Sequence, residues 1–149
     1  MPEVRFYHLT KSSAQDALPK LLEKTLERDK RALVKLPDED AVHTWNEHLW
    51  DYEPGCFLPH GSIKEPDPDT QPIFLTHADE NPGRAEYLFL IGGADCQDLE
   101  AFDMCAILFD GSDEAAVGWA RGRWKQLRET ALDLTYWQQD ERGKWGKKG

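Results

Sequence analysis

Two stretches of the chain carry hydrophobic residues at the spacing of an α-helix, residues 12–28 and residues 112–128. A third helix is predicted from Asp38 to about Trp50. Its start is marked by Pro37, which ends the preceding apolar run, and by the acidic residues that follow, because negative charge is favourable at a helix N-terminus. The pattern therefore predicts three main helices.

Shorter apolar runs predict strands at residues 4–9, 31–36 and 104–109. The last run, MCAILF, is apolar at every position, which is typical of a central strand buried on both faces. Strands and helices alternate in the first half of the chain, and this order predicts parallel strands covered by helices. Residues 73–77 and 86–91 are also predicted strands. The segment between them is too short for a helical crossover, so we expect an antiparallel hairpin in a mixed α/β sheet.

Length and hydrophobic content fit one domain. The chain has 149 residues, of which 40% are hydrophobic, and this is enough for a single core. We expect the domain to span residues 1–139, with a final edge strand at 132–138. Residues 140–149 form a basic, glycine-rich tail that is expected to fray. The proline-rich residues 51–72 predict a long loop.

Charge, cysteine content and the length of the apolar runs indicate which partners and which compartment to expect. The formal net charge of -10 repels nucleic acid, so DNA is expected to be contacted only indirectly. Residues 121–149 are net basic, which leaves direct binding of single-stranded DNA by this segment as a lesser possibility. Three cysteines suggest reduced thiols. Because no apolar run is long enough to span a membrane, we expect a cytoplasmic protein without a membrane partner.

Metal chemistry has little support in the sequence. Cys56 and His60 lie four positions apart on the predicted loop, but a structural zinc site needs four ligands and no second pair of suitable spacing exists. His43 and His48 are five positions apart and belong to no HExxH motif. We therefore expect no metal.

One group of residues leaves an enzymatic alternative open. Gly92 and Gly93 follow a predicted strand, although no phosphate-binding motif can be written there, and Asp110 ends the most apolar strand. Asp110 is either a functional carboxylate or the cap of the next helix. The alternative function is thus a small flavodoxin-like enzyme that binds a nucleotide or phosphate, whereas our main expectation is a protein without catalytic residues or cofactor.

The predicted helix at residues 112–128 has two adjoining faces of different chemistry. One face is apolar and aromatic, formed by Ala116, Ala120, Trp124 and Leu127. The face beside it is mostly cationic, formed by Val117, Arg121, Lys125 and Arg128. Trp124 lies on the border between them. The cations form either a solvated face or, together with Trp124, a binding surface for an acidic peptide with an apolar end.

Several segments in the same order resemble the chi subunit of bacterial DNA polymerase III. They are FYHL near the N-terminus, then RALVKL, TWNEHLW, PGCFLPH and WARGRWKQLR. The resemblance extends from Phe6 to about Trp137. It implies a non-catalytic accessory subunit of the clamp loader, with a three-layer α/β/α fold around a Rossmann-like mixed sheet that is mostly parallel and contains an antiparallel hairpin.

The resemblance also implies a partner for the basic helix. Chi subunits hold the acidic C-terminal tail of single-stranded-DNA-binding protein, which ends in Pro-Phe and a free carboxylate. The positions similar to the family's tail-binding helix are Arg121, Trp124, Lys125 and Arg128. Cations would bind the acidic tail, and an apolar wall would accept the phenyl ring.

A second partner surface is implied at the predicted loop. The position similar to the family's psi-binding phenylalanine is Phe57, with Leu58, Pro59 and His60 beside it. This chain departs from the family pattern in its acidic, proline-rich residues 65–69 and in its lysine-rich end, and both differences affect the psi side. The expected partner there is the psi subunit or a substitute for it.

Overall fold

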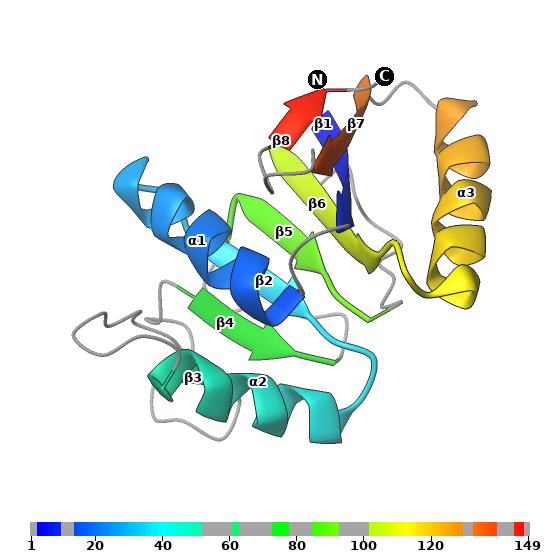
Figure 1. The fold of residues 1–149 in the computed structure, drawn as a ribbon. Coiled ribbons are helices and arrows are strands. Elements are labelled where there is room, and N and C mark those ends of the chain that lie inside the picture. The colour runs from blue at the N-terminus through cyan, green and yellow to red at the C-terminus, as the bar shows by residue number, and fades with distance from the viewer. Residues whose placement is uncertain are drawn as a thin grey trace.

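The computed structural model describes residues 3–9, 14–51, 61–62, 73–77, 85–92, 102–129, 133–139 and 145–147. Within these residues, eight strands form one sheet (Figure 1). The strands are β1 (Glu3–Leu9), β2 (Ala32–Lys35), β3 (Gly61–Ser62), β4 (Ile73–Thr76), β5 (Tyr87–Leu90), β6 (Met104–Asp110), β7 (Asp133–Gln139) and β8 (Trp145–Lys147). Their order across the sheet is β3-β4-β2-β5-β6-β1-β7-β8.

All neighbouring strands in this sheet are parallel except β7 and β8, which are antiparallel. The predicted fold class, a mostly parallel mixed sheet with one antiparallel hairpin, is confirmed. The strand predicted to be central, β6, lies between β5 and β1 and is buried from Met104 to Phe109. A strand with neighbours on both sides and helices on both faces has no exposed position for a polar side chain, and this explains the unbroken apolar run.

The predicted location of the hairpin was wrong. β4 and β5 do not pair with each other, because β2 lies between them and is parallel to both. Val34 of β2 is opposite Leu75 on one side and Phe89 on the other. All four residues of β2 are buried, so both of its edges need hydrogen-bonding partners. β4 and β5 therefore lie on opposite sides of β2, although they follow each other in the chain.

The antiparallel hairpin lies instead at the C-terminal end of the chain. β8 pairs with β7, with Trp137 opposite Lys147 and Gln139 opposite Trp145. Two expectations differ from this arrangement. Residues 145–147 form a strand within the segment that was expected to fray, and β7 was expected at the edge of the sheet but has β8 beside it. Within the long predicted loop, the structure describes Gly61–Ser62 as β3, at the opposite edge.

Three helices cover the two faces of the sheet in the described part of the chain. α1 (Ala14–Glu27) and α2 (Glu39–Asp51) lie on one face, and α3 (Glu114–Arg128) lies on the other (Figure 1). Side chains of β1 alternate between the two layers, as expected for a strand. Val4 and Phe6 pack with the α3 layer, whereas Tyr7 and Leu9 pack with the α1 layer.

Two local signals explain where helices begin. Asp38, directly after Pro37, accepts a hydrogen bond from the backbone N–H of Ala41 at 2.8 Å, which satisfies one of the free donors at the start of α2. Asp113 does the same for α3, accepting from the N–H groups of Ala115 and Ala116 at 3.0 and 3.4 Å. No helix in the described ranges is long and apolar enough to cross a membrane.

Candidate functional site

The helix α3 presents the two faces that its sequence predicts. Ala120 and Leu127 are buried against the sheet, while Arg121, Lys125 and Arg128 are exposed. The helix contacts β6 and β7, and the strand residues beside it include Phe109 near the end of β6 and Tyr136 in the middle of β7. Its cations therefore lie beside the last residues of β6 and the middle of β7.

Trp124 is half-buried and held in place by two aromatic rings. Its indole meets the ring of the fully buried Phe6 edge-on, with centroids 5.3 Å apart. The ring of Tyr136 contacts it in the same manner at 5.9 Å. Such edge-to-face pairs contribute about 0.5–1.5 kcal/mol beyond the burial of area. The indole of Trp124 is thus packed against the core in a fixed orientation and does not extend freely into solvent.

A cavity of about 280 Å³ lies between α3 and the sheet. It is lined by Phe109, Val117, Ala120, Arg121, Trp124, Lys125, Arg128 and Tyr136. All four residues of the predicted tail-binding group are therefore brought together around one hollow. The cavity floor is aromatic and aliphatic, and three cations stand on its rim. Among the described residues that line it, none is acidic.

The rim cations are available for a ligand. Within the described ranges, no ion pair or side-chain hydrogen bond involves Arg121, Lys125 or Arg128. The three residues lie on successive turns of one helix, where Cβ atoms at positions i and i+3 or i+4 are about 5–6 Å apart. Lys125 and Arg128 also lie in the last turn of α3, where the helix dipole stabilises positive charge. The site therefore offers a row of cations beside an apolar hollow.

A polar group adjoins the cavity at its Arg121 end. Nδ1 of His8 and the hydroxyl of Tyr136 form a hydrogen bond of 2.6 Å, which fixes the Tyr136 side chain. Burial, and then the charge of Arg121, lower the pKa of His8, while Asp110 opposes them weakly. Burial also raises the pKa of Tyr136, so the phenol stays protonated at neutral pH. This end of the cavity thus combines an aromatic surface with a fixed hydroxyl.

This arrangement suits recognition of a peptide more than catalysis. An apolar hollow with cations on its rim can take one ring or aliphatic side chain and neutralise the carboxylates next to it. Arginine is especially suited to this because its planar guanidinium binds a carboxylate through two parallel hydrogen bonds.

Sequence reasoning missed three residues of this site, namely His8, Phe109 and Tyr136. All three come from strands β1, β6 and β7, which are adjacent and lie under α3. Side chains alternate between the two faces of a strand, so those that face α3 can be deduced once the strand order is known. The order itself was the missing information, because β1 and β7 are far apart in the chain.

The predicted psi-binding residues Phe57, Leu58, Pro59 and His60 lie outside the described residues. Their role stays a prediction. Cys56, the other member of the weak metal pair, also lies outside them.

The histidines of α2 have ordinary protein contacts. Nε2 of His43 lies 3.3 Å from a carboxylate oxygen of Glu47, and His48 packs edge-on against Trp45. In the described part of the chain, no group of three His, Cys, Asp or Glu residues is arranged to hold a metal ion.

The residues of the enzymatic alternative do not converge with the cavity. Asp110 accepts hydrogen bonds from the backbone N–H and the hydroxyl of Ser112, at 2.9 and 2.7 Å, and these bonds lower its pKa. It was expected to cap α3 if it had no chemical role, but Asp113 is the cap. Gly92 has a positive φ of 65°, as expected for a turn, and a Cβ at this position would lie 3.3 Å from the ring of Pro37. Gly93 lies outside the described residues.

Comparison with known proteins agrees with the family resemblance. The sequence model of the family described as "DNA polymerase III chi subunit, HolC" matches residues 1–135. A protein of Rickettsia prowazekii (strain Madrid E) named "Probable DNA polymerase III subunit chi" is 30% identical over 95 residues. This match covers 64% of the present chain, and the chain spans 58% of the length of that relative.

Proposed function

This chain belongs to the DNA polymerase III chi subunit family, and on that basis we propose that it binds the acidic C-terminal tail of single-stranded-DNA-binding protein in the α3 cavity. In this role it would be a non-catalytic accessory subunit that links the clamp loader to that protein. The observation that carries the proposal is the cavity itself, an apolar hollow with Arg121, Lys125 and Arg128 on its rim.

The terminal phenylalanine of the tail fits the hollow. Its ring would pack onto the aromatic floor formed by Phe109, Trp124 and Tyr136, where aromatic neighbours favour offset or edge-on contacts. A volume of about 280 Å³ is enough for a phenyl ring and part of the preceding proline. Burial of the ring supplies about 2 kcal/mol or more of the binding free energy.

The carboxylates of the tail fit the rim. Its free C-terminal carboxylate and its aspartates would pair with the three rim cations, which make no ion pair within the described part of the chain. Each exposed pair contributes about 0.2–1 kcal/mol, so the charges set the orientation and the rate of encounter more than the total affinity.

The experiment is a titration of the protein with a fluorescently labelled, aspartate-rich peptide that ends in Pro-Phe and a free carboxylate, followed by anisotropy at low salt. We expect micromolar affinity, and a loss of about tenfold or more for Lys125→Glu and for Arg128→Glu. The same peptide with a C-terminal amide should bind more weakly.

A matched control is Lys20→Glu, which reverses an exposed charge on α1 across the sheet and should leave the affinity unchanged. Absence of micromolar binding at low salt would refute the proposal. So would equal affinity of the Lys125→Glu, Arg128→Glu and unmodified proteins.

We further propose that Phe57 and the adjacent Leu58, Pro59 and His60 contact psi or a substitute subunit, so that DNA is reached only through partner proteins. The support here is the family resemblance alone, because these residues lie outside the described ranges. A pull-down from the source cells with the unmodified protein, Phe57→Ala and Lys125→Glu tests it. Separate losses of two partners are expected, and loss of the same partner from both variants would contradict two surfaces.

A further inference from the structure

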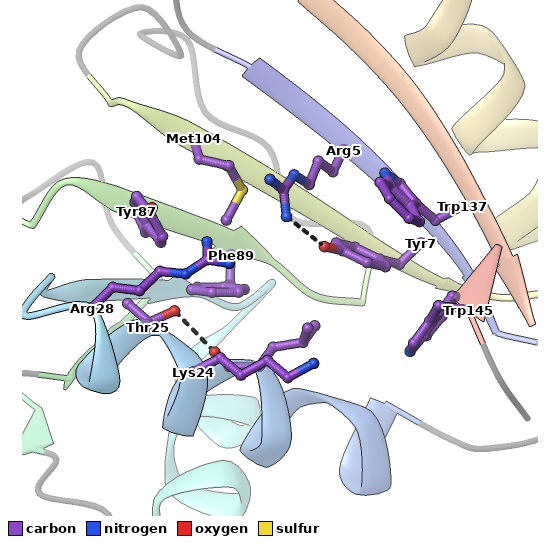
Figure 2. A pocket seen from close by; sticks show the side chains of 11 residues that line it. Arg5, Tyr7, Lys24, Thr25, Arg28, Tyr87, Phe89, Met104, Trp137 and Trp145 are labelled. Atoms are coloured by element: carbon purple, nitrogen blue, oxygen red, sulfur yellow. Dashed lines mark hydrogen bonds between the residues drawn. The ribbon is translucent and has the colours of Figure 1, made fainter. Parts of the chain in front are cut away.

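A second pocket, of about 200 Å³, lies on the opposite face of the sheet, between α1 and strands β5, β6, β1, β7 and β8. Figure 2 shows Tyr7, Trp137 and Trp145 on the strand side and Lys24, Thr25 and Arg28 on the helix side. This pocket shares no residue with the α3 cavity. It therefore does not belong to the proposed tail-binding site.

The strand side of the pocket is an aromatic wall. The rings of Tyr7 and Trp137 are stacked with centroids 6.4 Å apart, and Trp145 meets Tyr7 edge-on at 5.1 Å. Tyr7 is buried, whereas Trp137 and Trp145 are partly exposed. Large aromatic side chains that remain partly exposed beside a hollow are typical of contact surfaces for a partner.

The position of this wall in the fold explains its exposure. In the described part of the chain, α1 packs mainly on β2 and β6 and α2 on β3 and β4, whereas β1, β7 and β8 lie at one end of the sheet. Figure 1 shows α1 in front of the middle of the sheet, with the strands that carry the wall, β1, β7 and β8, at one end of it. The pocket is thus a groove between the flank of α1 and the end of the sheet that carries Tyr7, Trp137 and Trp145.

The helix side of the groove is cationic. Lys24 is in the last turn of α1 and Arg28 follows one turn later, so both side chains lie on the same face of the helix. Within the described residues neither side chain has an ion-pair partner. The third cation, Arg5, is already engaged, since it pairs with Glu3 and donates to the hydroxyl of Tyr7 at 3.3 Å. No carboxylate is found among the described residues that line the groove.

We infer that this groove binds a peptide segment of a partner protein that places one aromatic side chain against Trp137 and Trp145 and its neighbouring carboxylates against Lys24 and Arg28. The chemistry of the two walls matches these two requirements. Because the residues differ from those of the α3 cavity, this inference is independent of the proposed function.

Single-stranded nucleic acid fits the same groove less well. A nucleic-acid strand carries a charge at every nucleotide and needs cations along its whole track. Here Lys24 and Arg28 stand on one wall only, so the groove lacks a continuous track of cations for a phosphate backbone. The net charge of -10 adds a general repulsion. A short acidic segment with one anchoring ring meets less of this repulsion.

The test is a nuclear magnetic resonance titration that observes the indole N–H signals of the tryptophans. The probe is the doubly blocked peptide acetyl-Asp-Glu-Phe-Glu-Asp-amide, which has no free carboxyl terminus. We expect saturable shifts for Trp137 and Trp145, which report the groove whether or not the probe also shifts the signal of Trp124 at the α3 cavity. The signal of Trp137 is a suitable reporter because its indole N–H donates a hydrogen bond to the hydroxyl of Thr135 at 3.0 Å, which fixes the orientation of the ring.

Matched variants separate this groove from the α3 cavity. By the shifts of Trp137 and Trp145, the Lys24→Glu/Arg28→Glu protein should bind the probe about tenfold more weakly. The same two shifts should keep their affinity in the Lys125→Glu/Arg128→Glu protein, which lacks only cations of the α3 cavity. A probe with Asn and Gln in place of the acids, or with Ala in place of Phe, should lose most of the shift.

Three outcomes would overturn the inference. They are no shift of Trp137 and Trp145 at millimolar probe, a shift that the Lys24→Glu/Arg28→Glu change does not weaken, and a shift produced by an oligothymidylate but not by the peptide. The last result would assign the groove to nucleic acid. None of these outcomes bears on binding of the Pro-Phe tail at α3, which Trp124 reports separately.

Discussion

Gly111 lies directly against the imidazole of His8, in a space too small for any side chain. A Cβ at Gly111 would overlap with the imidazole ring and would lie 2.8 Å from the carbonyl oxygen of Leu9. The N–H of Gly111 also donates to that carbonyl at 2.8 Å, which fixes the turn between β6 and α3. The glycine therefore controls both the start of the helix and the position of the ring that holds Tyr136.

Gly111→Ala is expected to destabilise the protein by about 1–3 kcal/mol, because neither the backbone of Leu9 nor the packed ring of His8 can move freely. Displacement of His8 would also break its hydrogen bond to Tyr136. Urea unfolding measures the first effect. Unchanged stability would show that the turn can adjust without cost.

Gly118→Ala is the matched control for Gly111→Ala, and it is expected to raise the stability instead of lowering it. Gly118 is an exposed residue within α3, and a Cβ there would meet no atom within 4 Å. Alanine is the better helix former, so the substitution should stabilise the protein by about 0.5–1 kcal/mol. A higher midpoint of urea unfolding would verify this, whereas a lower one would imply that Gly118 has a contact outside the described residues.

The cap of α3 should be worth a measurable part of its stability. Asp113→Ala removes the acceptor for the N–H groups of Ala115 and Ala116 and should cost about 1 kcal/mol. Asp113→Ser should restore most of this loss, because the serine hydroxyl can accept the same bonds. If alanine and serine variants unfold at the same urea concentration, the side-chain bonds are not the source of the stability.

Stability should also depend on His8 below neutral pH. Burial and Arg121 lower the pKa of His8 in the folded protein, while Asp110 raises it less. The unfolded chain therefore binds the proton more readily, and the stability that neutral His8 provides is complete above about pH 6.5 and lost as the pH falls toward the lower folded pKa. The decrease in unfolding free energy from about pH 7 to pH 5 should be smaller in His8→Gln. Equal decreases would show that His8 does not titrate differently on folding.

Tail binding should weaken as salt is added. The cations Arg121, Lys125 and Arg128 are exposed, and charges are screened beyond about 10 Å at 0.1 M salt. Anisotropy titrations of the Pro-Phe peptide at increasing sodium chloride should give a falling affinity, with a shallower slope for Lys125→Gln. An affinity that does not change with salt would assign the binding to the apolar hollow alone.

The helical faces of α3 were predictable because they depend only on local spacing. Apolar side chains at helical intervals define the buried side wherever the helix packs, and Ala120 and Leu127 are indeed buried while Lys125 is exposed. The four residues of the site on α3 follow from the same periodicity together with the family resemblance.

The strand neighbours were not predictable in the same way. The short segment before Tyr87 suggested a hairpin, since loop length is the local signal for antiparallel pairing. The pairing of β4 and β5 depends instead on β2, whose buried residues Leu33 and Val34 require a strand on each side. Tyr136 was missed for a related reason, because it reaches His8 from 128 positions away in the chain.

The placement of β1 has a consequence for how the protein folds. Both neighbours of this strand, β6 and β7, come from the last third of the chain, so Phe6 is buried only after that region has been made. Contacts of such large sequence separation slow the search for the native state. Until they form, an apolar strand with two open edges is exposed to other chains. Synthesis of the C-terminal strands is thus the step that protects the N-terminal one from aggregation.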